Sequence, residues 1–302
     1  MKPLAGVLSV FQTPFNEDES IDFATLEREI AWLHDEGVDG IVMAMVSETL
    51  RLSSDERERL AEAACKLGGE RGVVVISVGA ESSVVAERYA RHAERAGADA
   101  VMAIPPVSMA VGEDELARYY ERILAAISIP LIVQDASGYV GRPMSIGLQA
   151  RLLGRYGPER VLFKPEATPV GPRLTALREA TGGRARVFEG SGGIALAESF
   201  RRGIVGTMPG AEIIRGIVAL WRALVAGDEE RIYSLSLPIS SLVALEAGLD
   251  GFLAIEKYLL VKQGIFRNAI VRGPVGFLLD RETREEVDRL FARVMRAVEA
   301  AR

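Results

Sequence analysis

The sequence predicts a (β/α)8 TIM barrel with a C-terminal helical extension, and three observations lead to this fold class. Over residues 1–226, eight short apolar runs rich in Val and Ile alternate with longer segments of helical periodicity. Each run is apolar on both faces, as buried parallel strands require. The fingerprint G-x-G-x-x-G does not follow the first run, so a doubly wound open sheet is the second choice.

The expected elements follow one another as strand and then helix, eight times. The expected strands are Leu4–Val10, Val38–Met45, Val73–Val78, Ala100–Ile104, Ile129–Val133, Val161–Phe163, Arg186–Phe188 and Ile204–Met208. The expected helices are Phe23–Glu36, Ser53–Leu67, Ser82–Ala96, Glu113–Ile127, Met144–Leu153, Pro172–Ala180, Ile194–Arg202 and Gly210–Ala226. Apolar residues three and four positions apart mark the helices, and serines or acidic residues stand at several of their starts.

The rest of the chain is helical in pattern and contains no further expected strand. Its helices are expected at Asp228–Ala247, Phe252–Gln263 and Arg281–Ala300. Because no linker rich in Ser, Pro or Gly separates this part, we expect a barrel at residues 1–226 that continues directly into a helical subdomain at 227–302.

Composition excludes several kinds of site and partner. The 36 basic and 42 acidic residues give a net charge of -6 without a basic run, which argues against nucleic acid as a partner. One cysteine and two histidines without metal-ligand spacing argue against a zinc or histidine metal centre. No apolar stretch reaches the length of a membrane span, and the N-terminus is interpreted as a strand, so the expected location is the cytoplasm.

Lysine is rare in this chain, and one lysine stands where a barrel carries its chemistry. Of five lysines, Lys164 directly follows the apolar run Val161–Phe163, and catalytic groups of barrels lie at the carboxyl ends of strands. An ammonium group is poorly solvated there, which favours the neutral amine that attacks carbonyl groups. The alternative is an ion pair with Glu166 or Glu189. The other lysines, Lys257 among them, are expected where Arg could substitute.

Other polar candidates follow strands 2, 5 and 7. Ser47 could donate a hydrogen bond to a carboxylate, although serine after a strand is commonly a turn residue. Gln134 follows the fifth run, and we expect its side chain to face the cavity. The turn Gly190–Gly193 offers backbone N–H groups that suit a carboxylate or phosphate, although such turns are also common without a ligand.

Together these residues resemble the dihydrodipicolinate synthase/N-acetylneuraminate lyase family of class I, Schiff-base lyases. The matching segments are Thr13–Asp22, Glu36–Val42, the E-x-x-x-L-S pattern of Glu48–Ser53, Ala93–Pro106, and Lys164 at the end of strand 6. The resemblance implies that Lys164 forms a covalent imine with a 2-oxo acid. It also implies a homotetramer that uses no metal and no organic cofactor.

Three loops depart from the family pattern. The G-T-T-G-E loop reads Met45–Glu48, in which Ser47 can replace a threonine but Val46 cannot supply a relay hydroxyl. P-P-Y-Y becomes Pro105–Ser108, and Y-N-x-P-x-R becomes Gln134–Tyr139. The acid/base tyrosine and the substrate-binding arginine are therefore missing, which argues against synthesis of dihydrodipicolinate.

The remaining pattern is most similar to the branch of 2-keto-3-deoxy-sugar-acid dehydratases of the L-2-keto-3-deoxyarabonate type. This resemblance implies dehydration, with Lys164, Gln134 and Ser47 as catalytic residues. The residues expected to bind the substrate are Ser47, Glu48, Glu189, Gly190, Ser191, Gly192 and Met208. The group that transfers protons stays open among Glu48, Glu166 and Glu189. A pyruvate-dependent aldolase and a non-catalytic protein that binds a 2-oxo acid are the alternatives.

Overall fold

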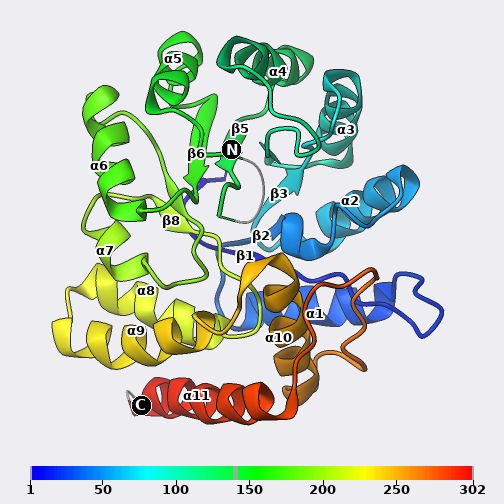
Figure 1. The fold of residues 1–302 in the computed structure, drawn as a ribbon, viewed down its shortest axis with the longest axis vertical. Coiled ribbons are helices and arrows are strands. Elements are labelled where there is room, and N and C mark those ends of the chain that lie inside the picture. Colours follow the sequence, from blue (N-terminus) through cyan, green and yellow to red (C-terminus); the bar gives the residue numbers. More distant parts are fainter. Residues whose placement is uncertain (1, 139–141, 301–302) are drawn as a thin grey trace.

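Eight parallel strands form a closed ring at the centre of the molecule, surrounded by helices (Figure 1). The computed structural model describes residues 2–138 and 142–300. The strands are β1 (Gly6–Val10), β2 (Gly40–Met43), β3 (Val73–Ser77), β4 (Ala100–Ala103), β5 (Leu131–Asp135), β6 (Val161–Pro165), β7 (Phe188–Glu189) and β8 (Gly206–Thr207). Their spatial order is β6-β5-β4-β3-β2-β1-β8-β7. Between β6 and β7, the Phe163 N–H donates to the Arg186 carbonyl at 3.0 Å and closes the ring. The predicted (β/α)8 barrel is confirmed.

The helices lie where the sequence places them, with ends that differ by up to four residues. They are α1 (Phe23–Asp35), α2 (Ser54–Gly68), α3 (Ser83–Ala96), α4 (Glu113–Ala126), α5 (Ile146–Tyr156), α6 (Val170–Ala180), α7 (Leu196–Phe200), α8 (Ile214–Ala226), α9 (Glu229–Val243), α10 (Gly248–Lys262) and α11 (Arg281–Glu299). Helix α10 begins four residues before the expected start at Phe252. The expected start was too late because the first turn of the helix contains two glycines, Gly248 and Gly251, which are typical of a loop. A short 3-10 turn, η1 (Met45–Ser47), was not expected.

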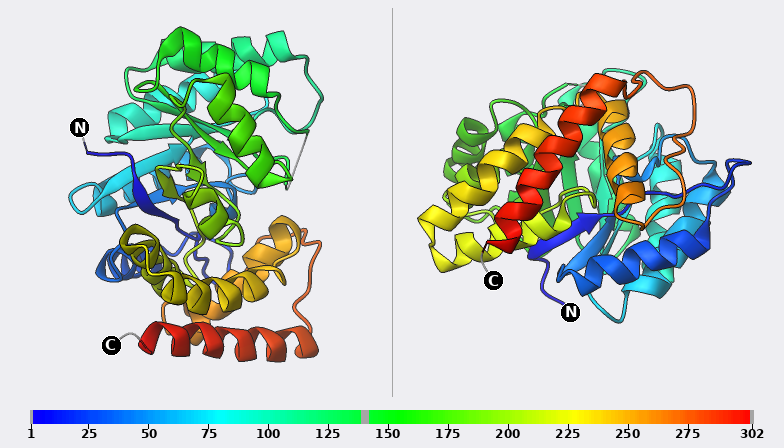
Figure 2. Two further views of the ribbon diagram at one scale, coloured as in Figure 1. Left: turned by 90° about the vertical axis from the view of Figure 1, so that its left-hand side faces the viewer. Right: turned by 90° about the horizontal axis from the view of Figure 1, so that it is seen from below.

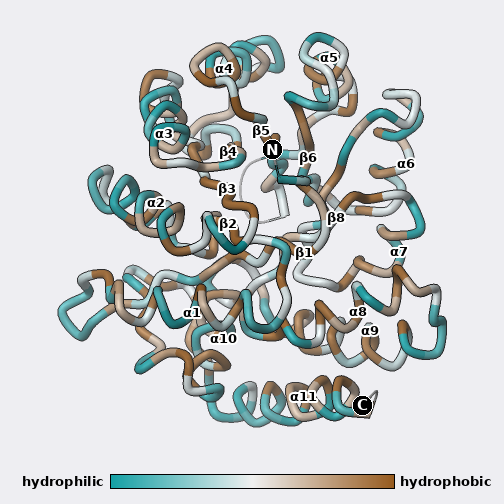
Figure 3. The backbone as a smooth tube through the Cα atoms, turned by 180° about the vertical axis from the view of Figure 1, so that it is seen from behind, coloured by the Kyte–Doolittle hydropathy of each residue, from teal (hydrophilic) through white to brown (hydrophobic). Residues whose placement is uncertain are grey.

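Both faces of the strands are buried, which explains their apolar runs. One cluster of buried side chains, including Leu8, Val42, Met102 and Phe188, fills the barrel. Residues that alternate with these along the strands, such as Ile41, join the larger cluster beneath the helices. Figure 3 shows this arrangement, with apolar strands at the centre and helices that carry both apolar and polar stretches around them. The packed interior leaves the carboxyl ends of the strands as the place for a site.

Helices α9, α10 and α11 cover one side of the barrel (Figures 1 and 2). Val287, Phe291 and Val294 of α11 are buried in the same apolar cluster as residues of α8 and α9. Among the described residues, no single helix is long and apolar enough to cross a membrane. In the same described part of the chain, α9 and α10 reach that length and hydropathy as a pair, but the pair is bent by 115°.

Candidate active site

The neighbouring strands β5 and β6 place Gln134 and Lys164 side by side. The two residues are paired in the parallel ladder, one register step before Asp135 and Pro165. Both strands therefore extend two residues further than their apolar runs. Polar side chains end these strands because the barrel interior opens here into a cavity.

A buried chain of polar groups links three side chains at this point. The Lys164 Nζ lies 3.1 Å from Oε1 of Glu166, and Nε2 of Gln134 donates to Oε2 of Glu166 at 2.8 Å. All three residues are buried. Burial raises the pKa of Glu166, while the charge of Lys164 and the hydrogen bond from Gln134 oppose that shift. The Oε1 of Gln134 has no hydrogen-bond partner, so it can accept one from a ligand.

Gly190, at the end of β7, allows the backbone to approach this pair closely. A Cβ at this position would lie 2.6 Å from Cε of Lys164 and 2.9 Å from Oε1 of Glu166. Since Cβ atoms do not come that close to neighbouring atoms, alanine here would displace the reactive pair.

The cavity at the carboxyl ends of the strands contains part of the predicted site. Of the predicted residues, Gln134, Lys164, Gly190, Gly192 and Met208 line it. Its lining also includes three ionisable residues, Lys164, Glu166 and Glu256. Among the open candidates for proton transfer, Glu166 is thus in the cavity and next to Lys164.

Ser47 lies beneath the cavity lining in this structure. Its hydroxyl donates to the Phe11 carbonyl at 2.5 Å and accepts from the Ala44 N–H at 3.1 Å. These bonds hold η1, and through it Met45 and Val46, which line the cavity. The serine therefore shapes this wall from behind.

Glu48 also lies outside the cavity lining. Its backbone is in the left-handed region, with a φ of 55°, and its Oε1 accepts from the fully buried Lys257. Its Oε2 accepts from the Arg272 N–H at 3.0 Å. Lys257 lies in a helix, as expected, but it is buried: its ammonium also donates to the Ile270 carbonyl at 2.7 Å and lies 4.5 Å from the centre of the Phe15 ring.

Glu189 and Ser191 hold the Gly-rich turn after β7. Oε1 of Glu189 accepts from the Ser191 N–H at 2.5 Å, and Oε2 accepts from the Thr207 hydroxyl at 2.9 Å. The Ser191 hydroxyl accepts from the Ala195 N–H at 2.9 Å. Neither residue lines the cavity, whereas Gly190 and Gly192 on either side of Ser191 do.

Sequence reasoning missed Glu256, which reaches the cavity from α10. The search was confined to residues that follow barrel strands, and Glu256 belongs to the C-terminal helices. A signal was present, because an acidic residue interrupts the apolar run Phe252–Leu260. No tyrosine in the described part of the chain lines the cavity, and Tyr139 lies outside the described residues.

A buried lysine stands beside a carboxyl group at the carboxyl end of β6, where barrel enzymes carry their reactive groups. The model of the dihydrodipicolinate synthetase family matches residues 3–293. The chain belongs to this family.

Relatives within the family carry different activities in their names. A 4-hydroxy-tetrahydrodipicolinate synthase of Bartonella bacilliformis is 27% identical over 290 residues, which cover 94% of this chain and 96% of the relative. An L-2-keto-3-deoxyarabonate dehydratase of Azospirillum brasilense is 28% identical over 242 residues, 78% of each chain. The crystal structure of a putative dihydrodipicolinate synthetase from Pseudomonas aeruginosa superimposes with a TM-score of 0.89 at 26% identity, over 97% of this chain and 100% of that one. The family's members are lyases, and this chain has their fold.

Proposed function

We propose that this chain is a Schiff-base-forming lyase that dehydrates a 2-keto-3-deoxy sugar acid. The observation that carries the proposal is the buried Lys164–Glu166 pair, in which an amine and a carboxyl group 3.1 Å apart can exchange one proton. The similarity to L-2-keto-3-deoxyarabonate dehydratase supports the substrate class. The imine itself withdraws electrons, so the reaction needs no organic cofactor.

Imine formation begins with transfer of a proton from Lys164 to Glu166. The free amine attacks C2 of the 2-oxo acid and forms a C–N bond, and one proton passes from the nitrogen to the C2 oxygen. That oxygen leaves as water with a second proton from Glu166, which gives the protonated imine. Because the pKa of Glu166 is raised, its carboxyl group can both accept and return this proton.

Dehydration then uses the same carboxylate. Glu166 removes a proton from C3, and the electrons move into the protonated imine to give an enamine. The enamine expels the C4 hydroxyl, which leaves as water after it takes the proton from Glu166. The product of this step is an unsaturated imine with a C3=C4 bond. Loss of a proton from C5 and addition of a proton to C3 convert it to an imine with a C4=C5 enol. Hydrolysis releases Lys164, and the enol rearranges to a 2-oxo acid semialdehyde, so the overall reaction loses one water.

Two neighbouring features orient the substrate in this proposal. The free Oε1 of Gln134 accepts a hydrogen bond from a substrate hydroxyl. Gln134 therefore orients the substrate and does not transfer protons, because an amide cannot act as a base near neutral pH. The substrate carboxylate lies between Met45–Val46 on one wall and the Gly190–Gly192 turn on the other. Met45, Val46, Gly190 and Gly192 line the cavity. Ser47 and Glu189 are positioning residues that hold these two walls.

An aldolase would share the imine but would deprotonate the C4 hydroxyl and break the C3–C4 bond. The second candidate function is a pyruvate-dependent condensation, which the similarity to a 4-hydroxy-tetrahydrodipicolinate synthase supports. The group favouring dehydration is Glu166, because it stands beside Lys164, close to where C3 of the imine would lie.

The products of 2-keto-3-deoxyarabonate and its homologues distinguish the candidates. We expect the purified chain to release a 2-oxo acid semialdehyde and no pyruvate, as measured by chromatography and mass spectrometry. Pyruvate as the product would show an aldolase instead. Binding without turnover of any homologue would show a non-catalytic 2-oxo-acid-binding protein.

A further inference from the structure

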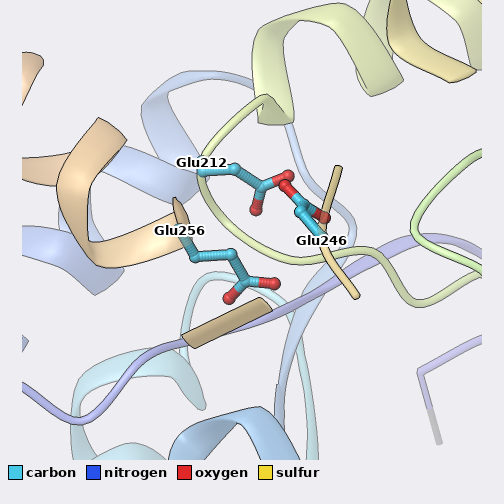
Figure 4. A group of neighbouring side chains, drawn as sticks. All are labelled: Glu212, Glu246 and Glu256. Carbon is cyan, nitrogen blue, oxygen red and sulfur yellow. The ribbon is translucent and has the colours of Figure 1, made fainter. Parts of the chain in front are cut away.

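Three buried carboxyl groups meet beside the active-site cavity, and the proposed reaction uses none of them. Glu212 follows β8, Glu246 lies between α9 and α10, and Glu256 is on α10. We call these residues the glutamate cluster. One oxygen of each lies within 4.8 Å of the other two, and Figure 4 shows the side chains turned toward one another. Each residue is at most 3% exposed.

The glutamate cluster has no positive partner in the described part of the chain. The nearby Lys257 pairs with Glu48 instead, and no other cation forms an ion pair with the three. Both oxygens of Glu246 and Oε2 of Glu212 lack any hydrogen-bond donor. Removing an ionised carboxylate from water costs several kcal/mol unless something compensates its charge. Glu246 is therefore an unpartnered, buried acid aimed at two others.

A neutral side chain beside the cluster also has a free oxygen. Gln12 follows β1, is fully buried, and donates from Nε2 to Oε2 of Glu256. Its Oε1 has no partner. Gly210 completes the enclosure, because a Cβ there would overlap both Oε2 of Glu212 and Oε1 of Glu256. The site thus combines unsatisfied oxygen acceptors with a backbone that leaves space between them.

We infer that the glutamate cluster binds a divalent cation of the size of Ca²⁺ through one oxygen each of Glu212, Glu246 and Glu256. The donor set contains only oxygen, which suits hard cations and not zinc. One oxygen from each of the three residues lies within 4.8 Å of the other two, which is close enough for all three to contact one ion with oxygen ligands at about 2.3–2.6 Å, as Ca²⁺ has. Mg²⁺ gives up its water ligands reluctantly and is usually held by only one or two carboxylates, so we expect Ca²⁺ to bind better.

The position of the cation indicates what it does. Glu256 and Gly210 line the active-site cavity, so the ion would stand in its wall. It would also join the segment after β8 to the connection between α9 and α10 and to α10 itself. We therefore expect the ion to fix the C-terminal helices against the barrel.

The alternative is that the carboxyl groups of the glutamate cluster are protonated and bind no cation. Calorimetry of the full chain distinguishes a cation-binding cluster from a protonated one. After dialysis against a chelator, titration with CaCl2 at neutral pH is expected to show one ion per chain and a raised Tm, with weaker binding of MgCl2. Glu246→Gln and Gly210→Ala should each weaken Ca²⁺ binding by at least tenfold. Glu230→Gln changes the charge equally at an exposed position of α9 and should bind like the parent chain.

Three results would overturn the inference. They are no saturable Ca²⁺ binding by the parent chain, unchanged binding in both Glu246→Gln and Gly210→Ala, or an equal loss in Glu230→Gln. If Glu246→Gln does not fold, Gly210→Ala and Glu212→Gln decide. Ca²⁺ binding is measured by calorimetry and imine formation by reductive trapping on Lys164, so failure of this inference and failure of the proposed function can be told apart.

Discussion

Lys164 and Glu166 form a buried pair at the cavity, with Nζ 3.1 Å from Oε1. Burial of the Glu166 carboxyl group raises its pKa, which favours the neutral form, and the amine becomes nucleophilic when it gives up its proton. Lys164 could be identified from the sequence because catalytic groups of barrels lie at the carboxyl ends of the strands, and Lys164 ends an expected strand. The sequence left three glutamates open as its partner, because only the folded chain shows which of them turns into the cavity.

Replacement of Glu166 by glutamine should keep the shape of the site and remove its proton transfer. We expect Glu166→Gln to lower kcat by about 10²–10⁴, the usual range for a general acid–base group. Glu230→Gln makes the same change of charge at an exposed position of α9 away from the cavity lining, and its kcat should not change. Equal losses in both variants would exclude Glu166 as the specific proton-transfer group.

The pH dependence should report the same carboxyl group. The carboxylate is the active form, so kcat/KM should fall as pH drops through the pKa of Glu166. Because burial raises that pKa, this fall should lie above the ordinary carboxyl range near 4.5. Rate profiles of the parent chain and of Glu166→Gln test this, and a limb that persists in the variant would assign it to another group.

Gly190 sets how closely the chain passes the reactive pair. We expect Gly190→Ala to abolish reduction-trapped adducts at Lys164 while the chain stays folded, because its methyl group would overlap the lysine Cε. Gly154→Ala on α5 has open space around the new methyl group and should trap normally. Normal trapping in Gly190→Ala would show that the pair can shift without loss of reactivity.

At the scale of elements, the ion pair between Lys257 and Glu48 joins α10 to the turn after η1. Both side chains are fully buried, so removal of one leaves the other uncompensated. We expect Lys257→Met to lose about 3–5 kcal/mol of unfolding free energy in urea, and Glu48→Gln in the same chain to restore part of it. Lys66→Met on the exposed face of α2 should change little. A loss below about 1 kcal/mol in Lys257→Met would contradict a structural role.

The sequence predicted strands and helices well because each has a local signature. Apolar runs such as Val73–Val78 marked the strands, and the Ser53–Glu56 capping box marked the start of α2. The function of α10 could not be predicted in this way. Its period shows which face is apolar, but not that Glu256 meets a cavity and Lys257 meets Glu48 more than 200 positions earlier.

At the scale of the whole molecule, the barrel was predictable and the closing of its site was not. Eight consecutive pairs of a strand and a helix commonly close into a (β/α)8 barrel, so the number of pairs in the sequence was sufficient to predict the fold. Ser47, Glu48 and Glu189 were expected to touch substrate because they follow strands. In the structure their side chains turn to Phe11, Lys257 and Thr207, contacts that depend on distant segments.

The family resemblance also implies an assembly. We expect light scattering after gel filtration to give four times the chain mass of 32.7 kDa. Dilution should not shift this mass at concentrations used for assays. A mass of one or two chains that is stable over the same range would contradict the tetramer.

The most direct test of the account is reductive trapping of pyruvate on the full chain. Incubation with pyruvate and borohydride, followed by digestion and mass spectrometry, should give one reduced adduct, located on Lys164. Lys164→Arg should give none, and Lys66→Arg should be labelled like the parent chain. If the parent chain forms no adduct, or forms it equally in Lys164→Arg, the chain is not a Schiff-base lyase that acts through Lys164.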